Sequence, residues 1–248
     1  MTGPHATITL SPSVGPLHLL PERAIWWPVA QALLVADVHW GKGAALRRAG
    51  VAVPQGSTAD DLMRLDALLA RYPVRQLIVL GDLVHRVPHD GDLAWVRSVR
   101  AWRERHAPLR MRLVLGNHDR VSRSSRVRAI PTPDHRNASS EPPDRDFVAS
   151  AAVARDDRSG LERLGDWELL SEGHREEGLS LWHHPPRNLD GPSVAGHWHP
   201  VTTVRAGARQ RVRLPVFWIC GQRLILPSFG GLTGGHPVPP DPRNQLWG

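Results

Sequence analysis

Carboxylate, imidazole and amide side chains gather in five short segments of the chain, each of which follows an apolar run. The segments are Asp37-Val38-His39, Gly81-Asp82, Gly116-Asn117-His118-Asp119, His183 and Gly196-His197-Trp198-His199. These donor types suit divalent Mn, Fe or Zn better than Ca, which favours all-oxygen sites, or Zn bound by thiolates. Two such ions held close together stabilise both the attacking and the leaving oxygen of a phosphoryl displacement. The residues therefore predict a pair of divalent metal ions and phosphoester chemistry.

The apolar runs indicate how these side chains are positioned. Three of the runs end directly before a motif and span residues 32–36, 77–80 and 113–115. Unbroken runs of this length are typical of strands covered on both faces. Helical patterns separate them, and this alternation predicts an α/β fold. Each motif is then expected at the carboxyl end of a strand, where open α/β sheets bind their ligands.

Two amphipathic helices are predicted between these strands. Ser57 is expected to cap the first helix, which carries Asp60 and Asp61 in its first turn and ends at Tyr72. Its apolar face consists of Leu62, Leu65, Leu68 and Leu69. The second helix is expected over about residues 92–105, and its inward face consists of Leu93, Val96, Val99 and Trp102.

The second half of the chain is less regular. Residues 121–160 are rich in Ser, Arg, Pro and Asp and are predicted to form a long flexible insertion, either overhanging the metal site or simply on the surface. Short strands are expected again at residues 179–182, 194–195, 212–214, 216–219 and 223–226. The Pro-rich tail after His236 is expected to be irregular. No linker divides the chain, so residues 1–248 are predicted to form a single domain.

Composition narrows the function classes. The net charge of +7 favours a polyanionic partner, but Lys42 is the only lysine among 31 basic residues, which also fits the arginine-rich coding of a GC-rich genome. Cys220 is the only cysteine, so no intrachain disulfide is possible. No apolar run could span a bilayer, and the N-terminus lacks the pattern of a signal peptide. We therefore expect a cytoplasmic protein without membrane contact.

The order of the five segments resembles the signature of the calcineurin-like metallophosphoesterase superfamily, from Ala32 to His199. A narrower similarity, to bacterial DNA-ligase-associated metallophosphoesterases, rests on residues 34–42, Arg47, Gly50 and residues 226–235. The resemblance implies a four-layer α/β/β/α sandwich and two divalent ions, with Mn²⁺ preferred and Fe or Zn possible. It also implies phosphodiesterase or endonuclease activity on DNA in a repair context, linked functionally to a DNA ligase, a helicase and an exonuclease.

The same resemblance implies roles for individual residues. The first metal would be bound by Asp37, His39 and His199, the second by Asn117, His183 and His197, and both by Asp82. His118 would stabilise charge on the scissile phosphate and protonate the leaving oxygen, while Asp119 would orient the His118 imidazole. The neighbouring His184 is the alternative to His183 as a ligand.

Three residues beside the motifs are candidates for substrate binding. Lys42 and Arg47 lie at a predicted loop-to-helix junction, where cationic groups suit phosphate. His85 stands where many superfamily members have an acidic residue, and it is expected either behind the metal ligands or in the substrate groove. Arg48 fits a phosphate contact and a solvated helix face equally well, and packing is the expected role of Trp40 and Trp198.

Other functions remain compatible with the same centre. A phosphomonoesterase of the phosphoprotein-phosphatase type usually has Glu after Asn-His, where this chain has Asp119. A cyclic-nucleotide or nucleotide hydrolase would use the same ligands. A catalytically silent scaffold usually loses metal ligands or the catalytic His, and none of these is missing here.

Overall fold

The computed structural model describes residues 6–86, 88, 92–119, 161–188, 190–206, 210–239 and 241–248. The insertion predicted at residues 121–160 lies outside the described residues. The helices are α1 (Lys42–Arg48), α2 (Ser57–Arg71) and α3 (Leu93–Arg105), with a short 3-10 helix, η3 (Leu161–Leu164). None of the helices in the described ranges is long and apolar enough to cross a membrane.

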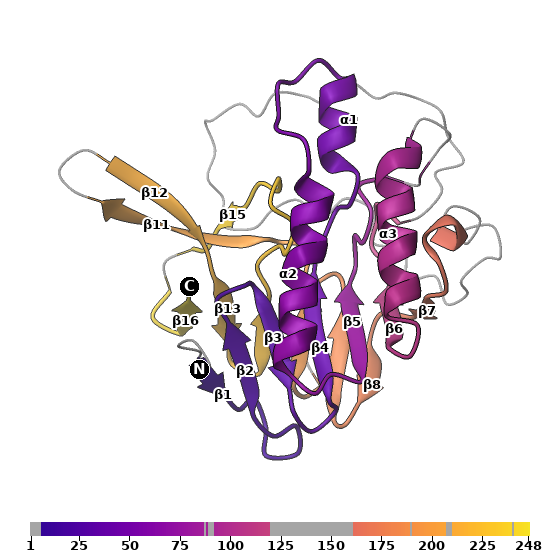
Figure 1. The fold of residues 1–248 in the computed structure, drawn as a ribbon. Coiled ribbons are helices and arrows are strands. Elements are labelled where there is room, and N and C mark those ends of the chain that lie inside the picture. The colour runs from indigo at the N-terminus through magenta and orange to yellow at the C-terminus, as the bar shows by residue number, and fades with distance from the viewer. Residues whose placement is uncertain are drawn as a thin grey trace.

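The strands form three sheets (Figure 1). From edge to edge, the first consists of β1 (Ala6–Ile8), β2 (Leu17–Leu20), β3 (Ala24–Trp27), β4 (Ala32–Ala36), β5 (Gln76–Leu80), β6 (Arg110–Val114) and β7 (Glu168–Leu170). The second consists of β16 (Asn244–Trp247), β13 (Phe217–Cys220), β14 (Arg223–Ile225), β10 (Ser193–Ala195), β9 (Leu179–Trp182) and β8 (His174–Glu176). The third consists of β12 (Gln210–Pro215), β11 (Pro200–Ala206) and β15 (His236–Pro237).

Parallel pairing brings the predicted motifs to one edge of the first sheet. In β4 and β5, Ala36 pairs with Leu80, and in β5 and β6, Leu80 pairs with Val114. The three strands therefore end side by side. All residues of β4 and β5 are buried, as expected for strands that are covered on both faces. The α/β class and the three motif-bearing strands are confirmed.

Two apolar clusters define the layers. The first lies between one face of the seven-stranded sheet and the helices α2, α3 and η3, and includes Leu65, Trp102 and Leu164. The second lies between the two large sheets, with Ile78 on one side and Leu181 on the other. None of α1 to α3 contributes to this second cluster, so the helices of the described ranges give no second outer layer. The four-layer form of the sandwich stays a prediction.

Helix α2 begins differently from the prediction. Gly56, not Ser57, occupies the N-cap position, in a left-handed conformation with φ of 94°, and Ser57 is the first helical residue. The chain turns into the helix by this glycine backbone, so no side-chain cap is formed. The other end agrees with the sequence, because Tyr72 is extended before Pro73 and stops the helix.

The prediction of an irregular tail after His236 was wrong. Strand β15 begins at His236 and pairs with β11, and β16 pairs with β13 from Phe217↔Trp247 to Cys220↔Asn244. Pro237 lies in the edge strand β15, where a proline is tolerated, and Pro239 and Pro242 precede β16. Strands at the edge of a sheet also need no continuous apolar pattern. The strands β1 and β8 are also short edge strands, which is why the apolar pattern of the sequence did not predict them.

Candidate metal centre

All seven predicted metal ligands meet where strands of the two large sheets end. Asp37 and His39 follow β4, Asp82 follows β5, and Asn117 follows β6. From the second sheet, His183 follows β9, and His197 and His199 follow β10. Backbone hydrogen bonds tie the loops together, for example from His39 N to Asp82 O at 2.9 Å and from Gly196 N to His183 O at 3.1 Å.

One group of ligand atoms is formed by Asp37, His39 and His199, whose donor atoms lie within 4.8 Å of one another. The His199 Nδ1–H donates to Gly234 O at 3.2 Å, so in the neutral ring Nε2 carries a lone pair. That Nε2 lies 3.4 Å from Asp37 Oδ1. His199 Nε2 and Asp37 Oδ1 are buried and have no hydrogen-bond partner among the described residues. The same is true of both ring nitrogens of His39. Buried acceptors without donors fit a cation.

A second group surrounds the fully buried His183. Its Nδ1–H donates to Leu80 O at 3.2 Å, while Nε2 lies 3.0 Å from Asn117 Oδ1 and 3.1 Å from His197 Nδ1. Burial holds the pKa of His183 well below its usual range, so the ring is neutral and has one N–H. The Nε2 lone pair therefore faces the Asn117 amide oxygen. Two acceptors this close repel each other unless a cation lies between them.

The alternative ligand, His184, is engaged elsewhere. Its Nδ1 is 2.7 Å from Glu172 Oε1, although its ring also lies within the group formed with His183 and His197. The sequence pattern gave no signal for Glu172, which comes from the turn between β7 and β8. The structure thus brings His183 to Asn117 and His184 to an acidic partner.

Asp82 stands between the two groups. Its Oδ2 is 3.8 Å from His39 Nε2, and its Oδ1 is 3.7 Å from His183 Nε2. Burial, and next the negative charge of Asp37, raise the pKa of Asp82 to about 7 in the metal-free protein. Two buried carboxylates side by side need positive charge to stay ionised. The whole donor set therefore fits two divalent cations, one in each group.

Five of the seven predicted ligands have a backbone conformation that is rare outside glycine. Their φ angles are 52° for Asp37, 53° for His39, 46° for Asp82, 69° for His197 and 46° for His199. A left-handed conformation costs a non-glycine residue roughly 1–3 kcal/mol and persists only where the surroundings impose it. Such conformations concentrate at functional sites, and here they turn each side chain inward from its strand end.

The glycines of the motifs make room for the ligands. A Cβ on Gly81 would overlap the His183 ring, and one on Gly116 would overlap Asp82. A Cβ on Gly196 would lie 2.7 Å from Asp37 Oδ2. Each glycine thus allows a ligand from another strand to approach its backbone closely.

His118 lies at the open side of the centre. Its Nδ1–H donates to His85 O at 2.8 Å, and its Nε2 is 4.0 Å from Asp82 Oδ2. The side chain is 39% exposed, so a substrate can reach it. The His85 ring stacks on the His118 ring with centroids 5.4 Å apart. The structure therefore brings both histidines to the centre.

The contact predicted for Asp119 was wrong. The His85 carbonyl, not Asp119, orients the His118 imidazole. The Asp119 carboxylate is buried and accepts from Val84 N at 3.1 Å and Gly116 N at 3.0 Å. The chain turns back after Asn117, so Asp119 points under the loop towards these amides. Its contacts fix the loops that carry Asp82 and Asn117.

The predicted substrate cations differ in position. Lys42 is half-buried and forms no ion pair with the described residues. Burial lowers its pKa, while Asp82 and Asp37 act in the opposite direction, so its ammonium lies within the field of the centre. Arg47 is exposed, and its Nη1 donates to Pro54 O at 2.8 Å. Its role as a phosphate ligand stays a prediction.

The two tryptophans of the motifs pack as expected. Trp40 is buried in the cluster beneath the helices, edge-on to Trp102. Trp198 is half-buried and stacks on Trp218 with ring centroids 5.3 Å apart. Both tryptophans therefore have the packing role expected of them. Arg48 forms an ion pair with Asp92 at 2.8 Å, so its charge is already partnered.

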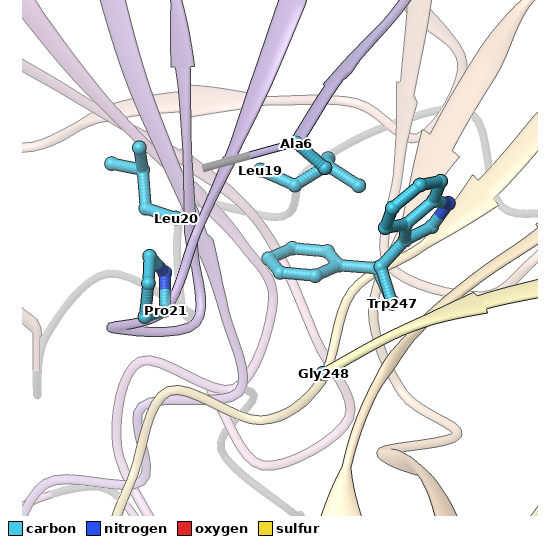
Figure 2. Close-up of a pocket in the computed structure, with 7 residues that line it drawn as sticks. Ala6, Leu19, Leu20, Pro21, Trp247 and Gly248 are labelled. Carbon is cyan, nitrogen blue, oxygen red and sulfur yellow. The ribbon is translucent and has the colours of Figure 1, made fainter. Parts of the chain in front are cut away.

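A separate apolar pocket of about 270 Å³ lies between the N-terminal strands and the C-terminus (Figure 2). Its lining consists of Ala6, Leu19, Leu20, Pro21, Phe217, Trp247 and Gly248. None of these side chains is titratable or binds metal ions. The pocket therefore offers no acid, base or metal chemistry, and the strand-end cluster is the candidate site.

Comparison with known proteins agrees with this geometry. The family model for the calcineurin-like phosphoesterases matches residues 31–221, which include all the proposed ligands. Among solved structures, the chain is similar to the nuclease MPE of Pseudomonas putida, with 33% sequence identity and a TM-score of 0.70. The match covers 98% of this chain and 96% of that chain. No match was found among curated proteins. The chain belongs to the calcineurin-like phosphoesterases and is a metal-dependent phosphoesterase.

Proposed function

We propose that this protein is a nuclease that hydrolyses phosphodiester bonds in DNA, as an endonuclease, with two Mn²⁺ ions in its centre. One observation carries the proposal: Asp82 lies between two separate ligand groups, with His118 beside it on the open side. The structural likeness to a nuclease extends over nearly the whole of both chains and supports the choice of substrate class. A role in DNA repair beside a ligase, a helicase and an exonuclease is part of the proposal.

In this proposal each ligand group holds one ion. The first is bound by Asp37, His39 and His199, and the second by Asn117, His183 and His197. Asp82, which lies between the groups, would contribute to both ions. The support comes from the buried lone pairs of Asp37, His39 and His199, which have no donor among the described residues. Bound divalent ions supply Lewis acidity, which polarises the phosphate and makes a water nucleophilic at neutral pH.

The residues around the ions have separate tasks. The His85 carbonyl accepts from His118 Nδ1, which fixes the ring with its Nε2 directed towards the centre. His118 can therefore stabilise the phosphate charge and give the Nε2 proton to the leaving oxygen. Lys42 adds positive charge on the same side. His85 is half-buried and stacks on the His118 ring, which places it beside the proposed path of the substrate.

A substrate panel tests the proposed activity. Protein supplied with Mn²⁺ is assayed on single-stranded DNA, duplex DNA, bis(p-nitrophenyl) phosphate and p-nitrophenyl phosphate. We expect cleavage of DNA and of the diester, with a much lower kcat/KM for the monoester. The Asp82→Asn variant, purified in the same way, controls for contaminating nucleases. If the wild type prefers the monoester, the nuclease proposal is wrong and the protein is a phosphomonoesterase.

A further inference from the structure

Arg23 lies at the metal edge of the first sheet, a position that the sequence pattern did not reveal. It occupies the turn between β2 and β3, where Leu20 pairs with Ala24. Strand β3 runs antiparallel to β4, with Ile25 opposite Leu34. The turn therefore lies beside the end of β4, where Asp37 follows. The left-handed conformation of Arg23, with φ of 66°, forms this tight turn.

The Arg23 guanidinium has no counter-ion in the part of the chain that the structure describes. It is half-buried, yet it forms no ion pair or side-chain hydrogen bond with any described residue. Burial lowers its pKa, the positive charge of Arg64 lowers it further, and Asp61 only partly opposes this. Asp61 is itself paired with Arg64 at 3.0 Å. A partly desolvated cation without a partner is costly, so it suits an anionic ligand.

A cavity of about 180 Å³ connects Arg23 with the metal centre. His199, a proposed ligand, lines it together with Arg23 and Arg213. The hydroxyl groups of the lining are already used, because Ser228 donates to Asp37 O and Thr233 donates to Gly230 O. Arg213 Nη2 donates to Gly235 O, so the Arg23 guanidinium and the other N–H groups of Arg213 are the side-chain donors that remain for a ligand in this cavity.

The hairpin of β11 and β12 continues this basic surface away from the centre. It projects from the body of the protein (Figure 1). Its register places Thr203 opposite Arg213 and Arg205 opposite Arg211, so all three arginines share one face of the ribbon. Like charges directly opposite each other are destabilising. Arg205 and Arg211 have no acidic partner among the described residues, so a polyanion would relieve their repulsion.

We propose that Arg23 and Arg213 bind the phosphate next to the scissile one, and that Arg205 and Arg211 continue the path of the DNA strand along the hairpin. The strand would thus leave the centre past His199 over the arginine face of β11 and β12. The inference rests on the proposed nuclease function and adds the side on which flanking phosphates are held. Paired guanidinium groups suit phosphate, because their planar donors match its oxygens.

Small chromogenic esters with a defined scissile bond test the phosphate site. The substrates are the p-nitrophenyl esters of thymidine 5′-phosphate and thymidine 3′-phosphate, each with and without a second phosphate on the other hydroxyl. In the wild type, the second phosphate should raise kcat/KM roughly tenfold for one of the two esters, as expected for a charged hydrogen bond. In Arg23→Gln with Arg213→Gln, this gain should fall to within about twofold.

The matched control is Arg75→Gln. Arg75 is exposed and precedes β5, at the edge of the sheet opposite the metal centre. It should keep the full gain from the second phosphate. Metal content, measured by mass spectrometry, should be the same in all variants, which separates loss of the phosphate contact from disturbance of the ions near His199.

Binding without catalysis gives a second readout for the hairpin. Anisotropy of a labelled single-stranded oligonucleotide is measured against salt in EDTA. Each lost phosphate contact should reduce the log–log slope by about 0.7. Arg205→Gln with Arg211→Gln should therefore lower the slope by roughly 1.4, and Arg75→Gln should leave it unchanged.

The outcomes separate the two proposals. A wild-type protein that cleaves none of the esters and no DNA with Mn²⁺ would overturn the nuclease assignment, and the inference with it. If the wild type cleaves them, but the arginine variants and Arg75→Gln show the same phosphate gain and the same salt slope, only the inference is overturned.

Discussion

Asp82 and His183 face each other across the interface of the two large sheets, with Asp82 Oδ1 3.7 Å from His183 Nε2. Asp82 comes from the end of β5, and His183 comes from the end of β9. Neither sheet alone provides a complete set of ligands. The centre therefore exists only when both sheets are packed together.

Asp82→Ala should abolish activity and remove most of the bound metal, because the two oxygens of this buried carboxylate face His39 in one ligand group and His183 in the other. Metal analysis of the purified variant measures this directly. Asp166→Ala, at an exposed position far along the chain, is the control and should keep both ions. Two tightly held ions per chain in Asp82→Ala would contradict the assignment.

Metal affinity should depend on pH through Asp82. Its pKa is about 7 in the metal-free protein, so below that pH a proton must leave before an ion binds. Loss of this proton should raise the affinity by up to tenfold per pH unit from about pH 5 to 7. His199 adds to the dependence, because the effect of burial on its ring is outweighed by the hydrogen bond and charge of Asp37, which raise its pKa. Isothermal titration in two buffers of different ionisation enthalpy would report the released proton. A pH-independent affinity over this range would exclude the role of Asp82.

The same pKa predicts the opposite trend for the stability of the metal-free protein. The native state keeps the Asp82 proton up to about pH 7, whereas a carboxyl in the unfolded chain loses it near pH 4. The native state thus binds more protons between these values, so this contribution is complete below about pH 4 and is lost as the pH rises to 7. Urea unfolding of the wild type and of Asp82→Asn in EDTA, at several pH values, measures this contribution to the free energy of unfolding. Equal pH slopes in the two proteins would contradict the role of Asp82.

His118→Ala should keep both metals and slow DNA hydrolysis by about 10²–10⁴-fold if the ring protonates the leaving oxygen. The loss should be much smaller for bis(p-nitrophenyl) phosphate, because nitrophenolate leaves without a proton. Comparison of kcat for the two substrates is the test. An equal loss on both would leave charge stabilisation as the only role of His118.

Asp119→Ala should act on stability more than on chemistry. It leaves the buried N–H groups of Val84 and Gly116 without acceptors, at a cost of about 2–4 kcal/mol in the free energy of unfolding. Asp119→Asn keeps an acceptor and should recover part of this loss. Chemical denaturation of the two variants decides the point, and unchanged stability in Asp119→Ala would show that the loop contacts are unimportant.

Gly81→Ala should destabilise the protein by about 2–5 kcal/mol and lower occupancy of the second metal group. The new Cβ would overlap the His183 ring, and φ at this position is 78°. Gly231→Ala is the matched control, because a Cβ there meets no atom within 4 Å. Thermal unfolding and metal content of both variants should separate them clearly. Similar behaviour of the two would contradict the packing argument.

The sequence was sufficient where chemistry follows directly from a local pattern. Asp37 and Asp82 come immediately after apolar runs, so parallel pairing alone brings them to the same edge. Arg23 could not be found in this way, because its position depends on the register of a short hairpin that has no clear pattern. The role of Asp119 depends on a return of the chain towards Val84, which no spacing rule describes.

The backbone around the ligands was also beyond prediction. Nothing in the residue types of Asp37 or His197 indicates a positive φ, since left-handed conformations are imposed by tertiary contacts. The Gly-rich segment after β14 contributed to the family resemblance without an assigned role. In the structure it supplies the Gly234 carbonyl that orients His199, so its glycines serve the metal site through the backbone.

The division of the ligands between two sheets has a consequence for the lifetime of the protein. Asp37, His39, Asp82 and Asn117 belong to one sheet, and His183, His197 and His199 to the other. Bound ions would therefore act as cross-links between the halves of the fold, and each ion that binds only the native state would shift the folding equilibrium towards that state by mass action. When metal is scarce, the protein would then lose its activity and would also be degraded faster by proteases. Metal supply would therefore influence how much of the protein is present in the cell.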